Sequence, residues 1–172
     1  MMVPVEFQAP WSKALRVTTV SSAVLLLLTI VCGVMTYPRI PSRAALMLIC
    51  LPSAILMAAI PFAIRGYVLT ERAIIVKRLG WQTTLPLTGL NSVGGDAEAM
   101  RGSLRLLGNG GLFSFSGEFW SRRLGRFRAL ATDPERAVVL RYPKRTVVIT
   151  PHDPQHFIIR ARTLLKTAQF PG

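Results

Sequence analysis

The sequence predicts a two-helix transmembrane hairpin followed by a mainly antiparallel β domain of about seven strands that ends in a C-terminal capping helix. Two charge-free apolar runs predict the hairpin. After Gly66, short runs rich in β-branched and aromatic residues, separated by turn signals, predict the sheet. A last segment with apolar residues at helical spacing predicts the cap. The chain then divides into an N-terminal arm (1–16), a hairpin (17–64) and a β domain (65–172).

The two apolar runs cover residues 17–35 and 44–64 and contain no charged residue. At about 1.5 Å per helical residue the first run reaches roughly 28 Å, which is close to the hydrocarbon thickness of a bilayer. It is longer than the apolar part of a secretory signal, so we expect it to be retained. A pair of buried helices in a soluble protein is the alternative reading. Pro52 and Pro61 predict a kink in the second run.

The orientation of the hairpin is predicted from the basic residues beside each span. Six lie on the side of the termini and two in the turn: Lys13, Arg16, Arg65, Arg72, Lys77 and Arg78 against Arg39 and Arg43. We therefore expect a multi-pass membrane protein with both termini in the cytoplasm. Trp11 and Tyr37 fit the aromatic belts at the two interfaces.

The segment "ITPHDPQHF" at residues 149–157 contains the chain's two histidines, and it reads as the start of a helix. Asp153 stands where an N-cap belongs and Pro154 at the first helical position. His152 would precede the cap and His156 would lie in the first turn, so the two cannot act as paired ligands on one helix face. We expect no metal and no cofactor.

Catalytic groups are sparse in this sequence. A nucleophile needs a base within hydrogen-bond reach, and the eight acids are spread thinly through the chain. Cys32 and Cys50 lie inside the predicted spans and are expected to be inert free thiols. These observations predict a protein that is not an enzyme.

A Gly-rich segment, "GNGGLFSFSG" at residues 108–117, lacks the pattern of a phosphate-binding loop. It predicts a tight turn and a β segment in which glycines adopt positive φ. The aromatic residues in and after it have two interpretations. They either close the open side of the β domain or contact a membrane or partner as exposed groups. These residues are Phe113, Phe115, Phe119 and Trp120.

Three stretches together carry a resemblance to a known family: "GYVLTERAIIVKRLGWQTTLPLTGLNSV", "RLLGNGGLFSFSGEFWSRRLGRFRALATD" and "AVVLRYPKRTVVITPHDPQHFIIRA". Following a hairpin, they resemble the membrane-anchored form of the bacterial pleckstrin-homology-like (PH-like) domain, over residues 66–167. The resemblance implies a strongly bent barrel or sandwich of seven strands, capped at one end by an amphipathic C-terminal helix. It supplies no catalytic residue.

Charge is the most informative functional signal. Residues 66–172 contain sixteen Lys and Arg against seven Asp and Glu, a net charge of +9. The candidate binding residues for a partner or an anionic surface form two groups: Arg122, Arg123, Arg126 and Arg128, and Arg141, Lys144 and Arg145. A membrane tether and the lack of a recognition motif argue against nucleic acid.

The composition therefore favours a non-enzymatic docking module whose partners are membrane lipids and other membrane protein subunits. As an accessory subunit of a larger membrane complex, the chain would bury small or kinked positions of its second span, at Pro52, Ala58 and Ala59, against foreign helices. The alternative is a module that acts alone and binds an anionic membrane surface, in which each basic residue near the surface contributes about 1 kcal/mol.

Overall fold

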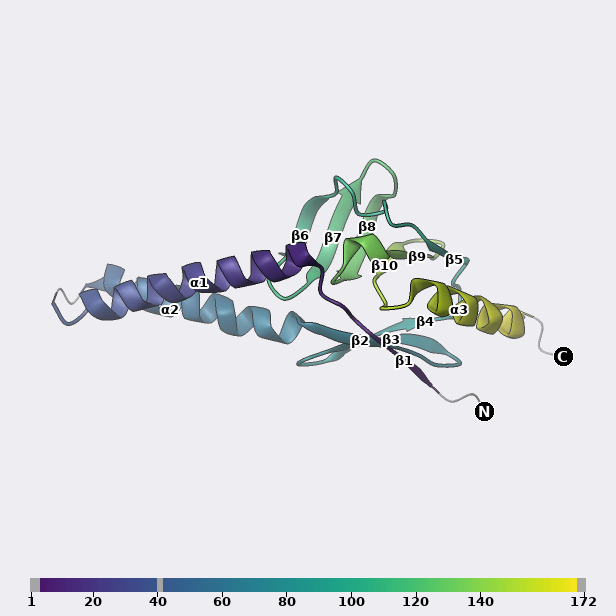
Figure 1. Cartoon of the computed structure of the whole chain (residues 1–172), viewed down its shortest axis with the longest axis horizontal. Coiled ribbons are helices and arrows are strands. Elements are labelled where there is room, and N and C mark those ends of the chain that lie inside the picture. Colours follow the sequence, from purple (N-terminus) through teal and green to yellow (C-terminus); the bar gives the residue numbers. More distant parts are fainter. Residues whose placement is uncertain (1–3, 40–41, 170–172) are drawn as a thin grey trace.

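A computed structural model describes residues 4–39 and 42–169 of the chain, so the outermost residues of the predicted arm and β domain lie outside it. Two long helices project away from a β domain that carries a third helix at its far side (Figure 1). The helices are α1 (Lys13–Thr36), α2 (Arg43–Ala59), the short 3₁₀ helices η1 (Ile60–Phe62) and η2 (Pro134–Arg136), and α3 (Pro154–Gln169). The strands are β1 (Val5–Gln8), β2 (Ile64–Leu69), β3 (Ala73–Arg78), β4 (Gln82–Pro86), β5 (Ser92–Gly95), β6 (Leu104–Gly110), β7 (Phe115–Ser121), β8 (Gly125–Ala131), β9 (Val138–Arg141) and β10 (Thr146–Ile149).

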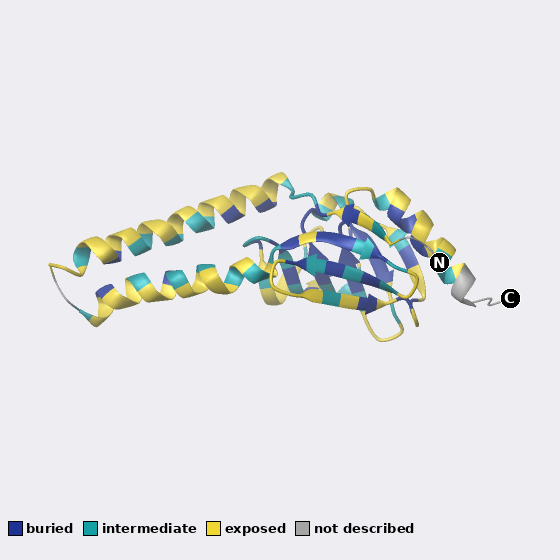
Figure 2. Cartoon of the chain, turned by 90° about the horizontal axis from the view of Figure 1, so that it is seen from below, coloured by how far each residue is buried: buried dark blue, intermediate teal, exposed yellow. Residues whose placement is uncertain are grey.

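Both hairpin helices begin at a serine cap. Ser12 Oγ accepts from the Leu15 amide at 3.1 Å, and Ser42 Oγ accepts from the Ala45 amide at 3.2 Å. The apolar segments have a mean hydropathy of 2.3, and only 11% of each is buried within the chain. A core helix of a soluble protein would be mostly buried, whereas these helices expose apolar side chains along their length (Figure 2). Their length and composition are those that a bilayer-crossing helix requires.

The two helices are in close contact near their turn, at Gly33. A Cβ at this position would lie 2.8 Å from Ile49 Cγ1 and 3.1 Å from the Ala45 carbonyl, so only glycine permits this distance. Pro52 is the proline inside α2, and it is already buried within the chain. Of the positions expected to meet a foreign helix, Ala58 is exposed and Ala59 half-buried.

The β domain consists of two sheets that are mainly antiparallel, as predicted. One has the order β1-β2-β3-β4 and the other β5-β9-β10-β8-β7-β6, with β8 and β10 as the parallel pair. The sheets are not closed into a barrel. Among the described residues nine strands follow the hairpin, and the two beyond the expected seven are β6 and β7 of the Gly-rich region.

The N-terminal arm is part of the β domain. Its residues Val5–Gln8 form β1, which pairs antiparallel with β2 in the register Phe7↔Tyr67. The hairpin is therefore inserted between two neighbouring strands of one sheet, and β2 begins at Ile64, directly after the helical segment. Strand β1 could not be recognised in the sequence because four residues are too few to show the alternation of apolar and polar side chains that marks a strand.

The Gly-rich region forms the β6–β7 hairpin, where the predicted positive φ values occur. Gly108 and Gly117 lie opposite one another with φ of 110° and 141°, and a Cβ on either would overlap the backbone of the other strand. Phe119 is buried and stacks on Phe127 at 6.0 Å, so it closes one face of the sheet. Trp120 is 40% exposed, so it does not close the sheet as Phe119 does.

The main core lies between the two sheets and under α3. Its largest fully buried members include Tyr67 from the four-stranded sheet, Leu130 from the six-stranded sheet and Phe157 from α3. Phe157 packs edge-on against Phe7 of β1 at 5.1 Å. A smaller core around Phe127 covers the other face of the six-stranded sheet.

The C-terminal helix begins where the sequence predicts it to begin. Asp153 Oδ1 accepts from the His156 amide at 3.0 Å, and Pro154 is the first helical residue. Phe157, Ile158 and Ala161 form its buried face. The observed order of two apolar helices, antiparallel sheets and a capping helix confirms the predicted architecture.

Candidate functional site

The topology of the six-stranded sheet brings the two predicted groups of basic residues to one end of that sheet. Arg122 and Arg123 lie in the β7–β8 turn, and Lys144 and Arg145 lie in the β9–β10 turn. Because β8 and β10 run parallel, with Arg128 opposite Val147, the two turns lie at the same end of the sheet. Arg126 and Arg128 are on β8 and Arg141 ends β9.

This end is opposite to the end that contacts the hairpin. The Thr132 carbonyl, directly after β8, accepts from the Ser12 amide at the foot of α1. Just before β7, the Gly111 carbonyl accepts from the hydroxyls of Thr18 and Thr19 at 3.1 and 3.0 Å, and the Ser114 hydroxyl donates to the Phe62 carbonyl at 2.9 Å. The β6–β7 loop is therefore fixed between the feet of the two helices.

Two of the predicted arginines are neutralised within the chain. Arg123 Nε lies 2.7 Å from Asp96 Oδ2, and Arg126 Nε lies 3.1 Å from Glu118 Oε2. Arg145 is placed over the ring of Tyr142 at 5.0 Å. Partial burial raises the pKa of Tyr142, and the positive charge of Arg145 opposes that shift.

An open pocket of about 540 Å³ joins one predicted group to apolar side chains. Leu104 and Trp120 face each other across β6 and β7, and Arg122 and Arg123 line the same pocket from the turn. The remaining lining residues are Glu98, Arg101 and Gly102. The pocket therefore combines an apolar wall with a largely basic rim.

Strand β6 continues this apolar wall and was not predicted as part of a site. It is the edge strand of the six-stranded sheet. Leu104, Leu106 and Leu107 are exposed by 62%, 55% and 73%. Edge strands are normally protected from pairing with another chain by charged side chains or by a covering segment. Three exposed leucines instead make this edge favourable for such pairing. The "LRLL" run is the signal in the sequence that could have identified this edge.

A second unpredicted feature is Arg78, which is only 8% exposed. It occupies the last inward position of β3, after Ile74 and Val76, and its guanidinium lies over the rings of Phe62 and Trp81 at 5.8 and 5.5 Å. Among the residues that the structure describes, no acceptor lies within hydrogen-bond distance of its Nε. Burial, and then the positive charge of Arg128, lower the pKa of Arg78. The sequence alone does not distinguish Arg78 from the other basic residues beside the second predicted span.

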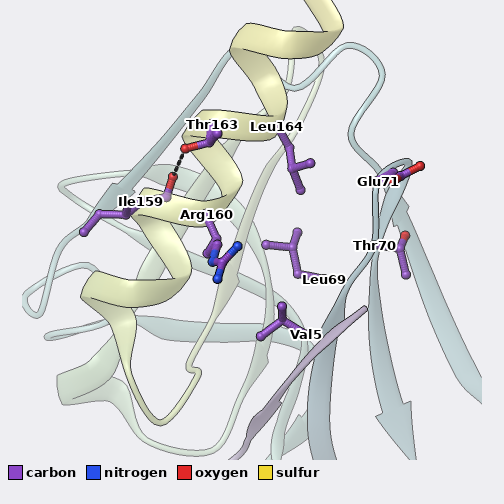
Figure 3. A pocket seen from close by; sticks show the side chains of 8 residues that line it. All are labelled: Val5, Leu69, Thr70, Glu71, Ile159, Arg160, Thr163 and Leu164. Atoms are coloured by element: carbon purple, nitrogen blue, oxygen red, sulfur yellow. Dashed lines mark hydrogen bonds between the residues drawn. The ribbon is translucent and has the colours of Figure 1, made fainter. Parts of the chain in front are cut away.

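A third hollow, of about 260 Å³, lies between α3 and the β1–β2 edge at the far side from the hairpin (Figure 3). Leu69 and Leu164 point into it from opposite walls. Ile159 is 62% exposed, and its carbonyl accepts from the Thr163 hydroxyl at 3.0 Å. This hollow is a shallow apolar gap beneath the capping helix.

His152 and His156 lie at the start of α3, and the described residues contain no group of three His, Cys, Asp or Glu side chains that could hold a metal ion. The His156 ring instead packs edge-on against Phe7 at 5.6 Å. Cys32 and Cys50 are free thiols.

Comparison with known proteins gives one match. The family model described as the bacterial PH domain matches residues 65–164, which is more than half of the chain and nearly the range of the resemblance seen in the sequence. No curated protein and no solved structure matches. The matched range begins at β2 and ends in α3, so it comprises the two sheets without β1 and most of the cap. The chain belongs to the bacterial PH domain family.

Proposed function

We propose that this chain is a non-enzymatic integral membrane protein of the bacterial inner membrane, in which the hairpin anchors a docking domain that binds another membrane protein as an accessory subunit. Membership of the PH family makes the β domain an interaction or lipid-binding module of a kind that is generally not catalytic. The N-terminal strand and the β domain lie at the same end of the hairpin (Figure 1), and the basic excess at that end favours the cytoplasmic side.

The observation that carries the docking proposal is the apolar edge of β6. As the edge strand of its sheet, β6 pairs with β7 on one side only, and the backbone donors and acceptors on its outer side form a template for strand addition by another chain. Leu107, Leu104 and the neighbouring Trp120 supply the apolar contacts. Arg122 lies at one end of this edge and favours a partner strand with an acidic end.

The location of the edge favours a partner that is itself a membrane protein. Strand β6 leads directly into the loop at Gly111, which is hydrogen-bonded to α1. A partner on β6 therefore lies beside the lipid-facing surface of α1 and can contact both. Such a continuous surface would bury the exposed leucines together with a face of the hairpin.

The test is affinity purification of the tagged full-length protein in a mild detergent, with mass spectrometry of what accompanies it. We expect one membrane complex at stoichiometric yield, lost in Leu107→Lys and retained in Thr84→Lys, which places the same charge on exposed β4 at the edge of the other sheet. A photocrosslinker at Leu106 should label the same partner. Equal recovery with both lysine variants would overturn docking at β6.

The alternative function is binding of an anionic bilayer surface by the predicted basic residues. The net charge of +9 in residues 66–172 favours this alternative. The position of the turns opposes it, since Arg122 and Lys144 lie at the sheet end away from the hairpin feet. Recovery of the protein alone, with vesicle binding that falls as salt rises, would support this alternative.

A further inference from the structure

Strand β6 runs from the sheet end that holds Arg122 towards the feet of the hairpin helices (Figure 1). Leu104 at its start pairs with Trp120 of β7, just before the β7–β8 turn. The residue that follows its last position, Gly111, accepts through its carbonyl from the Thr19 hydroxyl of α1 at 3.0 Å. A chain that pairs antiparallel with β6 therefore runs in the opposite sense, away from α1 and towards Arg122.

The open edge of β6 has a pocket on each face of the sheet. The pocket of about 540 Å³ beside Trp120 lies on one face. Arg105 pairs with Phe119, which belongs to the smaller core, so its side chain lies on the other face. On that face a pocket of about 250 Å³ is lined by Arg105 and Gly110 of β6 and by Phe115 and Phe119 of β7. Because successive side chains of a strand point to opposite faces, an added strand can place side chains in both pockets.

Each of these two pockets has one arginine that is not neutralised within the described part of the chain. Arg105 in the smaller pocket and Arg122 in the larger one take part in none of the ion pairs that the described residues form. The other two arginines of the larger pocket are already paired, with Glu98 and with Asp96. An added strand with apolar side chains and a carboxylate on each face complements this arrangement.

The hairpin end of β6 fixes where a membrane partner enters. The hydroxyls of Thr18 and Thr19 hold the β6–β7 loop at the foot of α1, where Val17 and Val20 are 63% and 61% exposed. If the hairpin spans a bilayer, a foreign helix packed beside α1 leaves the bilayer at this level. Its cytoplasmic continuation then begins at the hairpin end of β6. Since an antiparallel chain runs away from α1, this continuation is the segment that follows the foreign helix and not one that precedes it.

A second copy of this chain does not provide such a segment. The residues that follow its own second helix form β2, which is paired on one side with β1 and on the other with β3. Strand β6 contains Arg105 and no acidic residue, so two copies of β6 would bring like charges together. The net charge of +9 in residues 66–172 also favours an acidic partner.

We propose that the partner docked on β6 contributes an acidic cytoplasmic segment that directly follows one of its transmembrane helices. The segment adds to the six-stranded sheet as an antiparallel strand, the orientation that is more stable per residue. About seven extended residues, at roughly 3.4 Å each, match the length of β6. Apolar side chains of the segment contact Leu104 and Leu107, and its carboxylates face Arg105 and Arg122. This inference rests on the proposed docking function and adds to it the chemistry and the direction of the partner segment.

The first test is photocrosslinking in intact cells, with a crosslinking amino acid at Leu107 or at Leu104 of the full-length protein and mapping of the linked partner residues by mass spectrometry. Both positions are exposed, so the substitutions should not disturb folding. We expect both to link to the segment after a transmembrane helix of the partner. The residue linked at Leu107 should be closer in sequence to that helix than the residue linked at Leu104. A crosslinker at exposed Thr84 of β4 is the matched control and should not link to this segment.

The second test reverses one charge. Arg122→Glu should lower the recovery of the partner by about tenfold or more, because it places a carboxylate against the acidic segment. Exchange of the partner carboxylate nearest the Leu104 crosslink for lysine should restore recovery. Lys144→Glu is the control, since Lys144 is exposed at the same end of the sheet but outside the pocket, and it should leave recovery unchanged.

The outcomes separate this inference from the docking proposal. Retention of the partner in Leu107→Lys would overturn docking at β6 itself. If Leu107→Lys loses the partner but the crosslinks fall on a segment that precedes its transmembrane helix, or on a second copy of this chain, docking at β6 stands and this inference is wrong. The reverse order of the two crosslinks would overturn the antiparallel direction. Equal losses with Arg122→Glu and Lys144→Glu, or no loss with either, would overturn the acidic character of the segment.

Discussion

The interior of the β domain differs between the side beneath α3 and the side that faces the hairpin. Beneath α3, Phe157 is completely buried and packs against Phe7 of β1. Facing the hairpin, Arg78 is also buried, but its Nε has no hydrogen-bond partner among the described residues. We call the first side the closed end and the second the open end. The neighbouring Tyr67 hydroxyl is buried and paired, since it donates to the Leu130 carbonyl and accepts from the Thr150 amide at 3.2 Å. Three substitutions test this contrast.

The largest effect is expected at the closed end, from Phe157→Ala. Phe157 is completely buried between α3 and the sheets, so its truncation should lower the free energy of unfolding by about 3–5 kcal/mol. Urea unfolding of the full-length protein in detergent, followed by near-UV circular dichroism, measures the change. Ile159→Ala on the exposed side of the same helix should change it by less than about 0.5 kcal/mol. Similar losses in both variants would show that α3 does not seal the core.

An intermediate effect is expected from Tyr67→Phe, which removes the buried hydroxyl that pairs with the Leu130 carbonyl and the Thr150 amide and should cost about 1–3 kcal/mol. Burial raises the pKa of Tyr67 from 10.0 to about 12. The contribution of the neutral phenol is therefore fully present below pH 10 and is lost as pH rises from 10 towards 12, because the unfolded chain releases the proton first.

Unfolding free energies measured across this pH range in the wild type and in Tyr67→Phe check the assignment. The difference between the two proteins should shrink above pH 10. A difference that stays constant would show that Tyr67 is not the group responsible.

The smallest effect is expected at the open end, from Arg78→Met. The substitution removes two cation–π contacts and also removes an unpaired buried charge. The opposed terms should leave the unfolding free energy within about 1 kcal/mol of the wild type. Arg122→Met serves as the exposed control. A loss larger than that of Tyr67→Phe would make Arg78 a structural residue and erase the contrast between the two ends.

Much of the fold follows from local sequence signals. The apolar runs without charge gave both hairpin helices, although the second ends at Phe62, before the expected residue 64. The Asp153-Pro154 pair gave the start of α3 because a cap is a local device. Strand β1 escaped prediction because its pairing is not local. Nothing in four residues before a span shows that they will meet β2 about sixty residues later. Strands β6 and β7 pair with each other across a short loop, but the glycines of this segment weaken its strand signal.

The candidate sites were predicted less completely. Basic residues could be grouped along the sequence, but the parallel register of β8 and β10 was needed to bring Arg128 and Lys144 to one sheet. The sequence also could not separate the paired Arg126 from unpaired arginines. Arg78 follows Lys77 and resembles a topology signal, and only the alternation of β3 reveals that it points inward.

The pairing of β1 with β2 has a consequence for how the protein is made. These strands flank the hairpin in sequence and are neighbours in one sheet. If only one helix inserted into the bilayer, the two strands would end on opposite sides of the membrane and the sheet could not form. If the hairpin spans a bilayer, as we propose, completion of the sheet therefore requires that both helices insert. A β domain that lacks its first strand would expose the unpaired edge of β2.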